Sequence, residues 1–360
     1  MTIKSVGLRD FRNYEELSLD LGQGLNIFYG DNAQGKTNLL EAIFTAGTTR
    51  SHKGSRDKEM IRIGCESAHI RLMIEKKGLT RRIDMELRKN RSKGAAVDGI
   101  PVRRSVDLFG MLNLVFFSPE DLTMIKDGPS VRRRFIDMEL SQIDRIYLYN
   151  LSNFNKVLRQ RNELLKQMDM NSDIPDTLDV WDEQLVKYGG EVIEARKKFM
   201  DDLNDIVGSI HKKLSGGLEE LEVRYVPDVG SDEFMDRLLS GRRSDIWQKS
   251  TQTGPQRDDI IFIINGTDGR RFASQGQQRT AALSLKLSEI ELTRRVTGED
   301  PVLLLDDVLS ELDRKRQDML LSEIGDIQTL ITCTGLEEYV EKRRNDAEIF
   351  NVKAGKIHKE

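Results

Sequence analysis

Short runs of alternating apolar and polar residues dominate the first 30 positions of the chain. Apolar side chains recur mostly at every second or third position in three runs: Ile3, Val6 and Leu8; Leu17, Leu19 and Leu21; and Leu25, Ile27 and Phe28. Successive side chains of a β-strand point to opposite faces, so this alternation predicts strands with one buried face. After Tyr29-Gly30 the spacing changes to three and four over 37–46, which predicts a helix with a buried stripe.

Further strand signals follow this helix. Residues 69–75 and 82–87 alternate again and are separated by Lys77-Gly78, which predicts a β-hairpin. A short helix is expected near 103–109, and an apolar strand over 112–117.

Two long stretches in the middle of the chain predict helices. Residues 151–168 carry apolar side chains at alternating steps of three and four, with Arg161 at one apolar position, and residues 181–214 repeat the pattern after a polar break. Two such helices are expected to fold back as an antiparallel hairpin. Gly189-Gly190 is expected to kink the second helix, because adjacent glycines weaken a helix interior.

Strand signals return after about residue 218. Strands are expected at 221–225, 259–264 and 302–305, and a helix over 276–295. The run at 302–305 consists of bulky apolar residues only, which is typical of a buried parallel strand. The fold class is therefore α/β, with a mostly helical insertion in the middle of the chain.

Composition excludes several classes of protein. The chain has 360 residues, of which 38% are apolar, and no stretch approaches the roughly 18 uncharged apolar residues that a membrane helix needs. The start of the chain carries Lys4, Arg9 and Asp10 and does not resemble a signal peptide. Two cysteines and four scattered histidines argue against a disulfide framework and a zinc site. We expect a cytoplasmic protein with no membrane partner.

Charge is distributed unevenly along the chain. The net charge is −4, yet residues 50–104 hold 16 basic and 7 acidic side chains. Such a basic region suits a polyanion such as DNA, and it also suits a solvated hairpin with a charged face. The candidate DNA-binding residues in it are Arg81, Arg82, Arg88, Lys89, Arg91, Lys93, Arg103 and Arg104. Arg132-Arg133-Arg134 allows the same two interpretations.

The segment from Gly30 to Thr37 matches the phosphate-binding loop pattern, two glycines five apart followed by Lys-Thr. The glycines let successive N–H groups point at phosphates, and the following helix presents its positive N-terminus. Lys36 is expected to reach the β and γ oxygens of a nucleotide, and Thr37 to offer a hydroxyl to Mg²⁺. The candidate cofactor-binding residues are Gly30, Asp31, Asn32, Ala33, Gln34, Gly35, Lys36 and Thr37.

Two adjacent carboxylates, Asp306 and Asp307, follow the apolar run 302–305. They are expected at the carboxyl end of a buried strand, where α/β folds bind ligands. Asp306 would hold Mg²⁺, and Asp307 would orient or deprotonate the attacking water. An acidic cap on the next helix is the alternative.

A second anion cradle is predicted at residues 274–279, directly before the expected helix. Ser274, Gly276, Gln277 and Arg279 stand at its start, where backbone N–H groups are free to bind an anion. The order of phosphate loop, Ser-x-Gly-Gln and Asp strand resembles the ABC-type ATPases. That resemblance implies a head-to-tail dimer in which Lys36 and Asp307 of one copy face Ser274 and Gly276 of the other across ATP.

The combination of motifs resembles one family more closely, the RecF proteins. The motifs are Leu8–Tyr14, Gly30–Ile43, Phe117–Leu122, Gly128-Pro129 with Arg132-Arg133, Gly254–Asp259 and Ser274–Thr280. The resemblance implies an ABC-type head with a mixed-sheet lobe and an inserted helical lobe. Its segments would be 1–125 (phosphate-loop half and basic β region), 126–250 (helical insertion) and 251–360 (signature and Asp strand).

The resemblance also implies a function. RecF proteins bind ATP and Mg²⁺, dimerise with ATP on double-stranded, gapped or junction DNA, and hydrolyse ATP weakly with stimulation by DNA. They act with RecR and RecO to load RecA in recombinational repair, replication-fork maintenance and the SOS response. Arg12 and Asn13 resemble nucleotide contacts of related SMC-type heads.

This chain departs from the wider ABC pattern in ways that affect catalysis. Asp307 replaces the usual Glu and is one methylene shorter, so slow hydrolysis and a switch role are expected. Thr332-Cys333-Thr334 stands where many ABC proteins have a switch His, and Ser118 or Glu120 stands in for the Q-loop Gln. An ATP-binding subunit of a transporter is the alternative function, although the long hairpin and the basic region argue against it.

Overall fold

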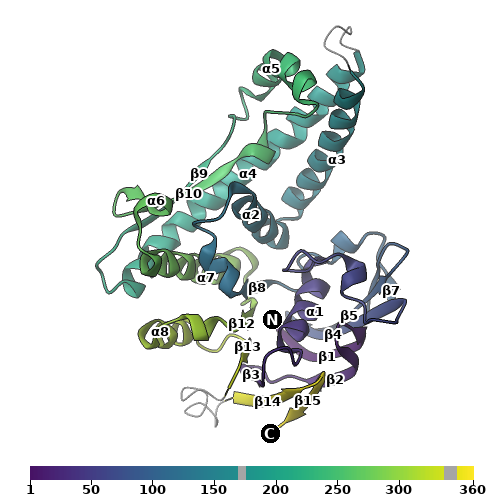
Figure 1. The fold of residues 1–360 in the computed structure, drawn as a ribbon, viewed down its shortest axis with the longest axis vertical. Helices are drawn as coiled ribbons and strands as arrows, with labels where there is room; N and C mark the ends of the chain where they lie inside the picture. The colour runs from purple at the N-terminus through teal and green to yellow at the C-terminus, as the bar shows by residue number, and fades with distance from the viewer. Residues whose placement is uncertain (169–175, 336–346) are drawn as a thin grey trace. The chain divides into compact units, whose positions relative to one another are not determined.

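A computed structural model describes residues 1–168, 176–335 and 347–360 (Figure 1). Contacts between Cα atoms divide the chain into two compact units. The first comprises Met1–Leu122 and Glu289–Glu360, and the second comprises Thr123–Ser288.

A mixed six-stranded sheet forms the centre of the first unit. Its strands, in spatial order, are β15 (Lys356–Lys359), β14 (Ala347–Lys353), β3 (Leu25–Tyr29), β13 (Thr329–Cys333), β12 (Val302–Asp306) and β8 (Leu114–Phe117). All neighbours are parallel except β15, which pairs antiparallel with β14. Strands β8, β12 and β13 are buried along their whole length, which explains their continuous apolar runs.

A second six-stranded sheet of the first unit is antiparallel throughout. Its order is β2 (Tyr14–Asp20), β1 (Thr2–Phe11), β4 (Ser67–Lys76), β5 (Leu79–Arg88), β6 (Gly94–Val97) and β7 (Ile100–Pro101). Helix α1 (Lys36–Thr48) contacts strands of both sheets, and nearly all of its residues are buried. The phosphate-loop helix is therefore held between the two sheets.

The remaining elements of the first unit are short. They are α8 (Arg314–Ile324) and the 3-10 helices η1 (Asp57–Glu59), η2 (Ser105–Leu108) and η5 (Val308–Glu311), while η3 (Pro119–Thr123) spans the division between the units.

The second unit is mostly helical. Its helices are α2 (Pro129–Ile143), α3 (Arg145–Gln167), α4 (Asp176–Leu214), α5 (Phe234–Gln248), η4 (Pro255–Arg257) and α6 (Gly269–Phe272), and α7 (Gln275–Thr297) begins in it. A three-stranded antiparallel sheet has the order β11 (Thr267–Asp268), β10 (Asp259–Ile264) and β9 (Leu221–Val226). Helices α3 and α4 pack along each other and form the long hairpin of Figure 1.

Buried ion pairs tie the helices of the second unit together. Arg161, which stands in the apolar pattern of α3, is fully buried and binds Asp182 of α4 at 2.6 Å and Asp245 of α5 at 2.7 Å. Arg196 of α4 binds Asp258 at 2.7 Å in the same unit. A buried guanidinium needs such partners, because an unpaired charge in the interior is very costly.

The three arginines at the start of α2 do not all face solvent. Arg132 is 2% exposed, and its Nε lies 2.7 Å from Oδ1 of Asp259. The Arg133 guanidinium donates to the Asp258 carbonyl at 2.6 Å. Both interpretations of this run, a solvated face and a contact with DNA phosphates, are therefore wrong for Arg132, which serves the packing of α2 on β10.

Most elements expected from the sequence are confirmed, including the hairpin of β4 and β5 and the strands β9, β10 and β12. The helix expected near 103–109 is only the 3-10 helix η2. Helix α4 runs unbroken through Gly189-Gly190. Gly189 has a steric role, since a Cβ there would lie 2.6 Å from Phe234 Cε1 and 3.1 Å from Phe154 Cε2.

The glycine pair of α4 gives a stability test. Gly189→Ala would force the two aromatic rings aside and is expected to lower the free energy of unfolding by about 1–3 kcal/mol. Gly190→Ala is the matched control: its nearest neighbour would be Ser231 Cβ at 3.8 Å, so a gain of about 0.5–1 kcal/mol from helix propensity is expected. Urea denaturation followed by circular dichroism measures both, and equal effects would contradict the packing described.

Candidate nucleotide-binding site

The phosphate loop lies between β3 and α1 and has an unusual backbone. Gly30 and Gly35 have φ of 149° and 120°, and Ala33 has φ of 63°. A Cβ at Gly30 would collide with the Val352 carbonyl oxygen. Only glycine satisfies both the backbone and the space at this position, which explains the first glycine of the motif.

Lys36 is buried at the start of α1, with its ammonium turned back onto the loop. Its Nζ donates to the carbonyl oxygens of Gly30 at 2.6 Å and Asp31 at 2.8 Å. An ammonium held by two neutral carbonyls can exchange them for phosphate oxygens, which bind it more strongly because they are charged.

Asp306 ends strand β12 beside the loop. Its Oδ1 accepts hydrogen bonds from Thr37 Oγ1 and from Thr332 Oγ1, each at 2.8 Å. Burial raises the pKa of Asp306, and the two hydroxyl donors oppose that shift. The predicted metal-binding pair, Thr37 and Asp306, is thus in direct contact.

These donors fit Mg²⁺. Within the described residues, no group of three or more His, Cys, Asp or Glu side chains is arranged to hold a metal ion. A hydroxyl and a carboxylate supply two oxygen ligands, and Mg²⁺ characteristically takes one or two protein oxygens together with phosphate and water. A metal held only with its nucleotide is therefore the arrangement that this donor set supports.

Asp307 follows in a strained conformation, with φ of 53° and ψ of 20°. Its N–H donates to Thr332 Oγ1 at 3.0 Å. Its Oδ1 is buried and accepts no hydrogen bond from any described residue. Burial and the neighbouring Asp306 raise the pKa of Asp307. A strained residue with an unsatisfied buried acceptor is typical of a functional group prepared for a ligand.

Sequence reasoning did not find the role of Thr332. Its hydroxyl contacts both acids, and β13 is paired in parallel register with β12 so that Thr332 stands beside Asp306. The sequence offered one signal, since this threonine occupies the position expected for a switch His.

The partly exposed Arg12 forms an ion pair with the buried carboxylate of Glu41 on helix α1. The Arg12 guanidinium binds both carboxylate oxygens of Glu41, at 2.8 and 2.9 Å, and also donates to Ser55 Oγ and the Glu59 carbonyl. Burial raises the pKa of Glu41, but hydrogen bonds from Arg12 and Ser51 outweigh it and the net shift is downward. Arg12 thus fixes α1 to its surroundings, and a contact of Arg12 with nucleotide stays a prediction.

Asn13 reaches the loop directly. Its Nδ2 donates to the Gln34 carbonyl at 2.8 Å, and its Oδ1 accepts from Asn38 Nδ2 at 2.8 Å. Tyr14 donates its hydroxyl to the Gly35 carbonyl at 3.0 Å. The β1–β2 turn therefore supports the phosphate loop through two neighbouring carbonyls.

The two Q-loop candidates lie after β8. The N–H of Ser118 donates to Asp121 Oδ2 at 2.8 Å, and Ser118 is buried. Burial raises the pKa of Glu120, while hydrogen bonds and the charges of His52 and Lys53 shift it to a net lower value. The lowered pKa favours the ionised form of the Glu120 carboxyl group. Its negative charge also contributes to the raised pKa of Asp306.

The start of helix α7 is closed by a reciprocal cap. Gln277 N–H donates to Ser274 Oγ at 3.2 Å, and Ser274 N–H donates to Gln277 Oε1 at 2.9 Å. This is a capping box, which leaves Ser274 exposed at a helix N-terminus. Gly276 and Arg279 lie in the first turns of the same helix. The cap lies in the second compact unit and the phosphate loop in the first.

Most of the candidate DNA-binding residues have acidic partners. Ion pairs join Arg81 to Asp98, Arg82 to Asp84, Arg88 to Glu86, Lys89 to Glu66, Lys93 to Asp57 and Arg104 to Asp107. Arg91 and Arg103 are exposed, and no acidic side chain of a described residue lies within 4 Å of either. Six of the eight candidates are therefore paired with acidic side chains of described residues, and Arg91 and Arg103 are the two exposed candidates that are not.

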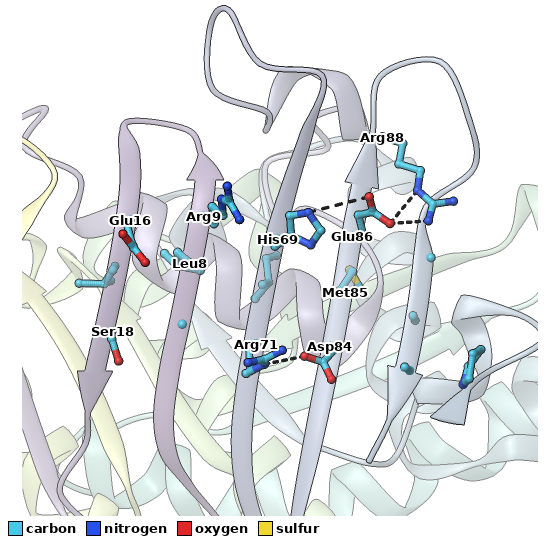
Figure 2. Close-up of a pocket in the computed structure, with 17 residues that line it drawn as sticks. Leu8, Arg9, Glu16, Ser18, His69, Arg71, Asp84, Met85, Glu86 and Arg88 are labelled. Atoms are coloured by element: carbon cyan, nitrogen blue, oxygen red, sulfur yellow. Dashed lines mark hydrogen bonds and ion pairs between the residues drawn. The ribbon is translucent and has the colours of Figure 1, made fainter. Parts of the chain in front are cut away.

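A hollow of about 690 Å³ lies on the outer face of the antiparallel sheet (Figure 2). Its lining combines small residues, among them Gly7, Gly94 and Ala96, with charged side chains. Arg71 pairs with Asp84 at 2.6 Å across the strands. Arg88 pairs with Glu86 in the same hollow, so Arg71 and Arg88 are both held by acidic side chains.

Comparison with known proteins identifies the family. The profile of the RecF/RecN/SMC N terminal domain family matches residues 2–358. The DNA replication and repair protein RecF of Lachnospira eligens is 55% identical over 359 residues, covering 99% of both chains. That of Lachnoclostridium phytofermentans is 56% identical over the full length of both. The chain belongs to the RecF family.

Solved structures agree with this assignment to the RecF family. The structure of the recombination mediator protein RecF with ATP in the RecFOR pathway matches with a TM-score of 0.92 at 35% identity, covering 99% of this chain and 97% of that one. The Smc head bound to the C-winged helix domain of ScpA matches with a TM-score of 0.58 at 14% identity, a likeness of fold alone. The expected mixed α/β head of RecF and SMC type is thereby confirmed. Among the described helices of this RecF-family chain, none has the length and apolar composition to cross a bilayer.

The raised pKa of Asp307 gives a pH-dependent prediction. An acid whose pKa is higher in the folded state destabilises the fold once it is ionised, so the cost is absent below the unfolded pKa of about 3.9 and grows as pH rises. Asp307→Asn is expected to raise Tm at pH 7.5 without nucleotide, with a difference that shrinks toward pH 4. Asp313→Asn is the control and is expected to lower Tm at pH 7.5. Its carboxylate accepts a hydrogen bond from the backbone of Arg316, which lowers the pKa of Asp313, so the ionised form stabilises the fold. A lower Tm for Asp307→Asn at pH 7.5 would contradict the burial described.

Proposed function

We propose that this chain is an ATP-dependent DNA-binding protein of recombinational repair. The observation that carries the proposal is the contact of the phosphate-loop Thr37 with Asp306, next to the buried Asp307 Oδ1, which accepts no hydrogen bond from a described residue. Family membership supports it, since the similar proteins include DNA replication and repair proteins and a recombination mediator with ATP in the RecFOR pathway. The full-length match to RecF proteins disfavours the alternative of a transporter subunit.

Each of the residues at the phosphate loop has a separate role in binding and hydrolysing ATP. The N–H groups of Gly30–Gly35 surround the phosphates, and Lys36 neutralises the β and γ oxygens. Thr37 and Asp306 would hold Mg²⁺, which supplies charge neutralisation at the transferring phosphoryl group. Asp307 orients the attacking water and accepts its proton, and Thr332 holds both acids in register.

The second half of the site is provided by another copy. Ser274 and Gly276 at the exposed start of α7 form an anion cradle, with Gln277 holding the cap and Arg279 in the next turn. A single triphosphate does not need two cradles from one chain. ATP therefore joins two copies head to tail, and slow hydrolysis releases them.

DNA binding is assigned to phosphate contacts of the basic region. We propose double-stranded and gapped or junction DNA as ligands, a weak ATP hydrolysis that DNA stimulates, and RecR, with RecO and RecA downstream, as partners. The support is resemblance to the family together with the exposed cations Arg91 and Arg103. These functions are those of a cytoplasmic protein.

The dimer is tested by the mass of the protein in light scattering. With Mg²⁺ and a slowly hydrolysed ATP analogue we expect a dimer, and with ADP or Mg²⁺ alone a monomer. Asp307→Asn should retain the dimer with ATP itself, because binding persists while hydrolysis is lost, and Lys36→Arg should also lose hydrolysis. A monomer under all conditions, with ATP binding demonstrated by calorimetry, would contradict the two-copy site.

The DNA surface is tested by charge reversal. Arg91→Glu and Arg103→Glu are expected to weaken binding of gapped duplex and to reduce the slope of log K against log salt by about 1 for each DNA phosphate that is no longer neutralised. Arg81→Glu, which removes a cation already paired with Asp98, should have a smaller effect. ATP affinity, measured by calorimetry, should not change. DNA affinity and salt slope equal to wild type in both exposed-site variants would exclude this surface.

A further inference from the structure

The C-terminal hairpin is hydrogen-bonded to the phosphate loop at Gln34. The Gly355 N–H donates to the Gln34 carbonyl at 3.0 Å, and the Ala354 N–H donates to Gln34 Oε1 at 2.7 Å. Asn13 Nδ2 donates to the same carbonyl at 2.8 Å. The phosphate-loop pattern allows any residue at the position of Gln34. The three contacts therefore indicate a role for Gln34 that the pattern does not specify.

The contacts on the Gln34 carbonyl determine where the next N–H points. A peptide group is planar and trans, so the C=O of Gln34 and the N–H of Gly35 point in opposite directions. Two donors from Asn13 and Gly355 hold the carbonyl outward, and the Gly35 N–H is therefore turned inward. No described residue accepts a hydrogen bond from that N–H, which leaves it available to an anion.

The turn between β14 and β15 is shaped for this contact. Ala354 and Gly355 have φ of 49° and 74°, the left-handed pair of a tight hairpin turn. A Cβ at Gly355 would lie 2.6 Å from the Asn13 carbonyl oxygen. The same hairpin places the Val352 carbonyl against Gly30, at the other end of the loop. The hairpin therefore contacts the phosphate loop at both ends.

We propose that Asn13 and the β14–β15 turn are positioning elements of the nucleotide site. Together they hold the Gln34–Gly35 peptide so that the Gly35 N–H faces the phosphate chain beyond the α-phosphate. The inference rests on the proposed function in taking a nucleotide polyphosphate as the ligand. It assigns to the C-terminal hairpin a part in the affinity for that polyphosphate.

A matched pair of glycine variants tests the turn. Gly355→Ala adds a Cβ against Asn13 at φ of 74°, whereas Gly266→Ala adds one in the β10–β11 turn at φ of 76°, with no other atom within 4 Å. Both variants carry similar backbone strain, and only the first disturbs the loop. Calorimetry with ATP, ADP and AMP, together with the Tm of each variant, separates the two effects.

The expected result is selective for the phosphate chain. Gly355→Ala should bind ATP and ADP about tenfold more weakly, the loss expected for one hydrogen bond to a charged group, and AMP unchanged. Gly266→Ala should bind all three like wild type despite a similar fall in Tm. Equal ATP affinity of Gly355→Ala and Gly266→Ala would overturn the inference and leave the proposed function standing. A wild-type protein without ATP affinity would overturn the proposed function itself.

Asn13→Asp provides a test that does not alter the hairpin. It keeps the oxygen that accepts from Asn38 and replaces the donor facing the Gln34 carbonyl. ATP affinity should fall and AMP affinity should not. Because both sites act through one peptide, the double variant with Gly355→Ala should lose no more than the larger single loss. Additive losses, or an unchanged affinity of Asn13→Asp, would contradict a shared positioning role.

Discussion

The hydrogen bond between Thr37 and Asp306 joins residues 269 positions apart in sequence, and the nucleotide site depends on it. It forms because β3, β13 and β12 are adjacent parallel strands whose carboxyl ends meet at one edge of the sheet. β3 leads into the phosphate loop, β12 ends in the two acids, and β13 supplies Thr332 between them. The order of these strands brings the side-chain oxygens of Thr37, Asp306 and Thr332, which lie far apart in sequence, into contact.

The carboxyl edge of the parallel strands is supported by elements to which no catalytic role is assigned. Helix α1 contacts strands of both sheets, and Arg12 after β1 forms an ion pair with Glu41 of this helix. The loop backbone is fixed from outside by Asn13, Tyr14 and the C-terminal hairpin. A loop whose carbonyls are satisfied by the protein leaves its N–H groups for phosphate, so preorganisation reduces the entropic cost of binding.

Sequence alone predicted the phosphate loop, the acidic strand and most elements, because these depend on local patterns. The 302–305 strand is apolar throughout since both of its faces are buried. What the sequence did not reveal depends on register between distant strands. The acids that pair with Arg81 and Lys89, the place of Thr332 beside Asp306, and the burial of Arg132 all require tertiary neighbours. The three functional segments, and direct nucleotide contacts of Arg12 and Asn13, stay predictions.

The central claim is that each ATP lies between the phosphate loop of one copy and the α7 cap of another. Mixing two inactive variants tests it most directly: Lys36→Ala, which lacks the loop function, and Ser274→Arg, which lacks the cap function. In a head-to-tail dimer, half of the mixed dimers' sites are intact, so an equal mixture should recover about a quarter of the wild-type DNA-stimulated hydrolysis. A mixture as inactive as each variant alone would show that loop and cap do not act across the dimer, and would contradict the account.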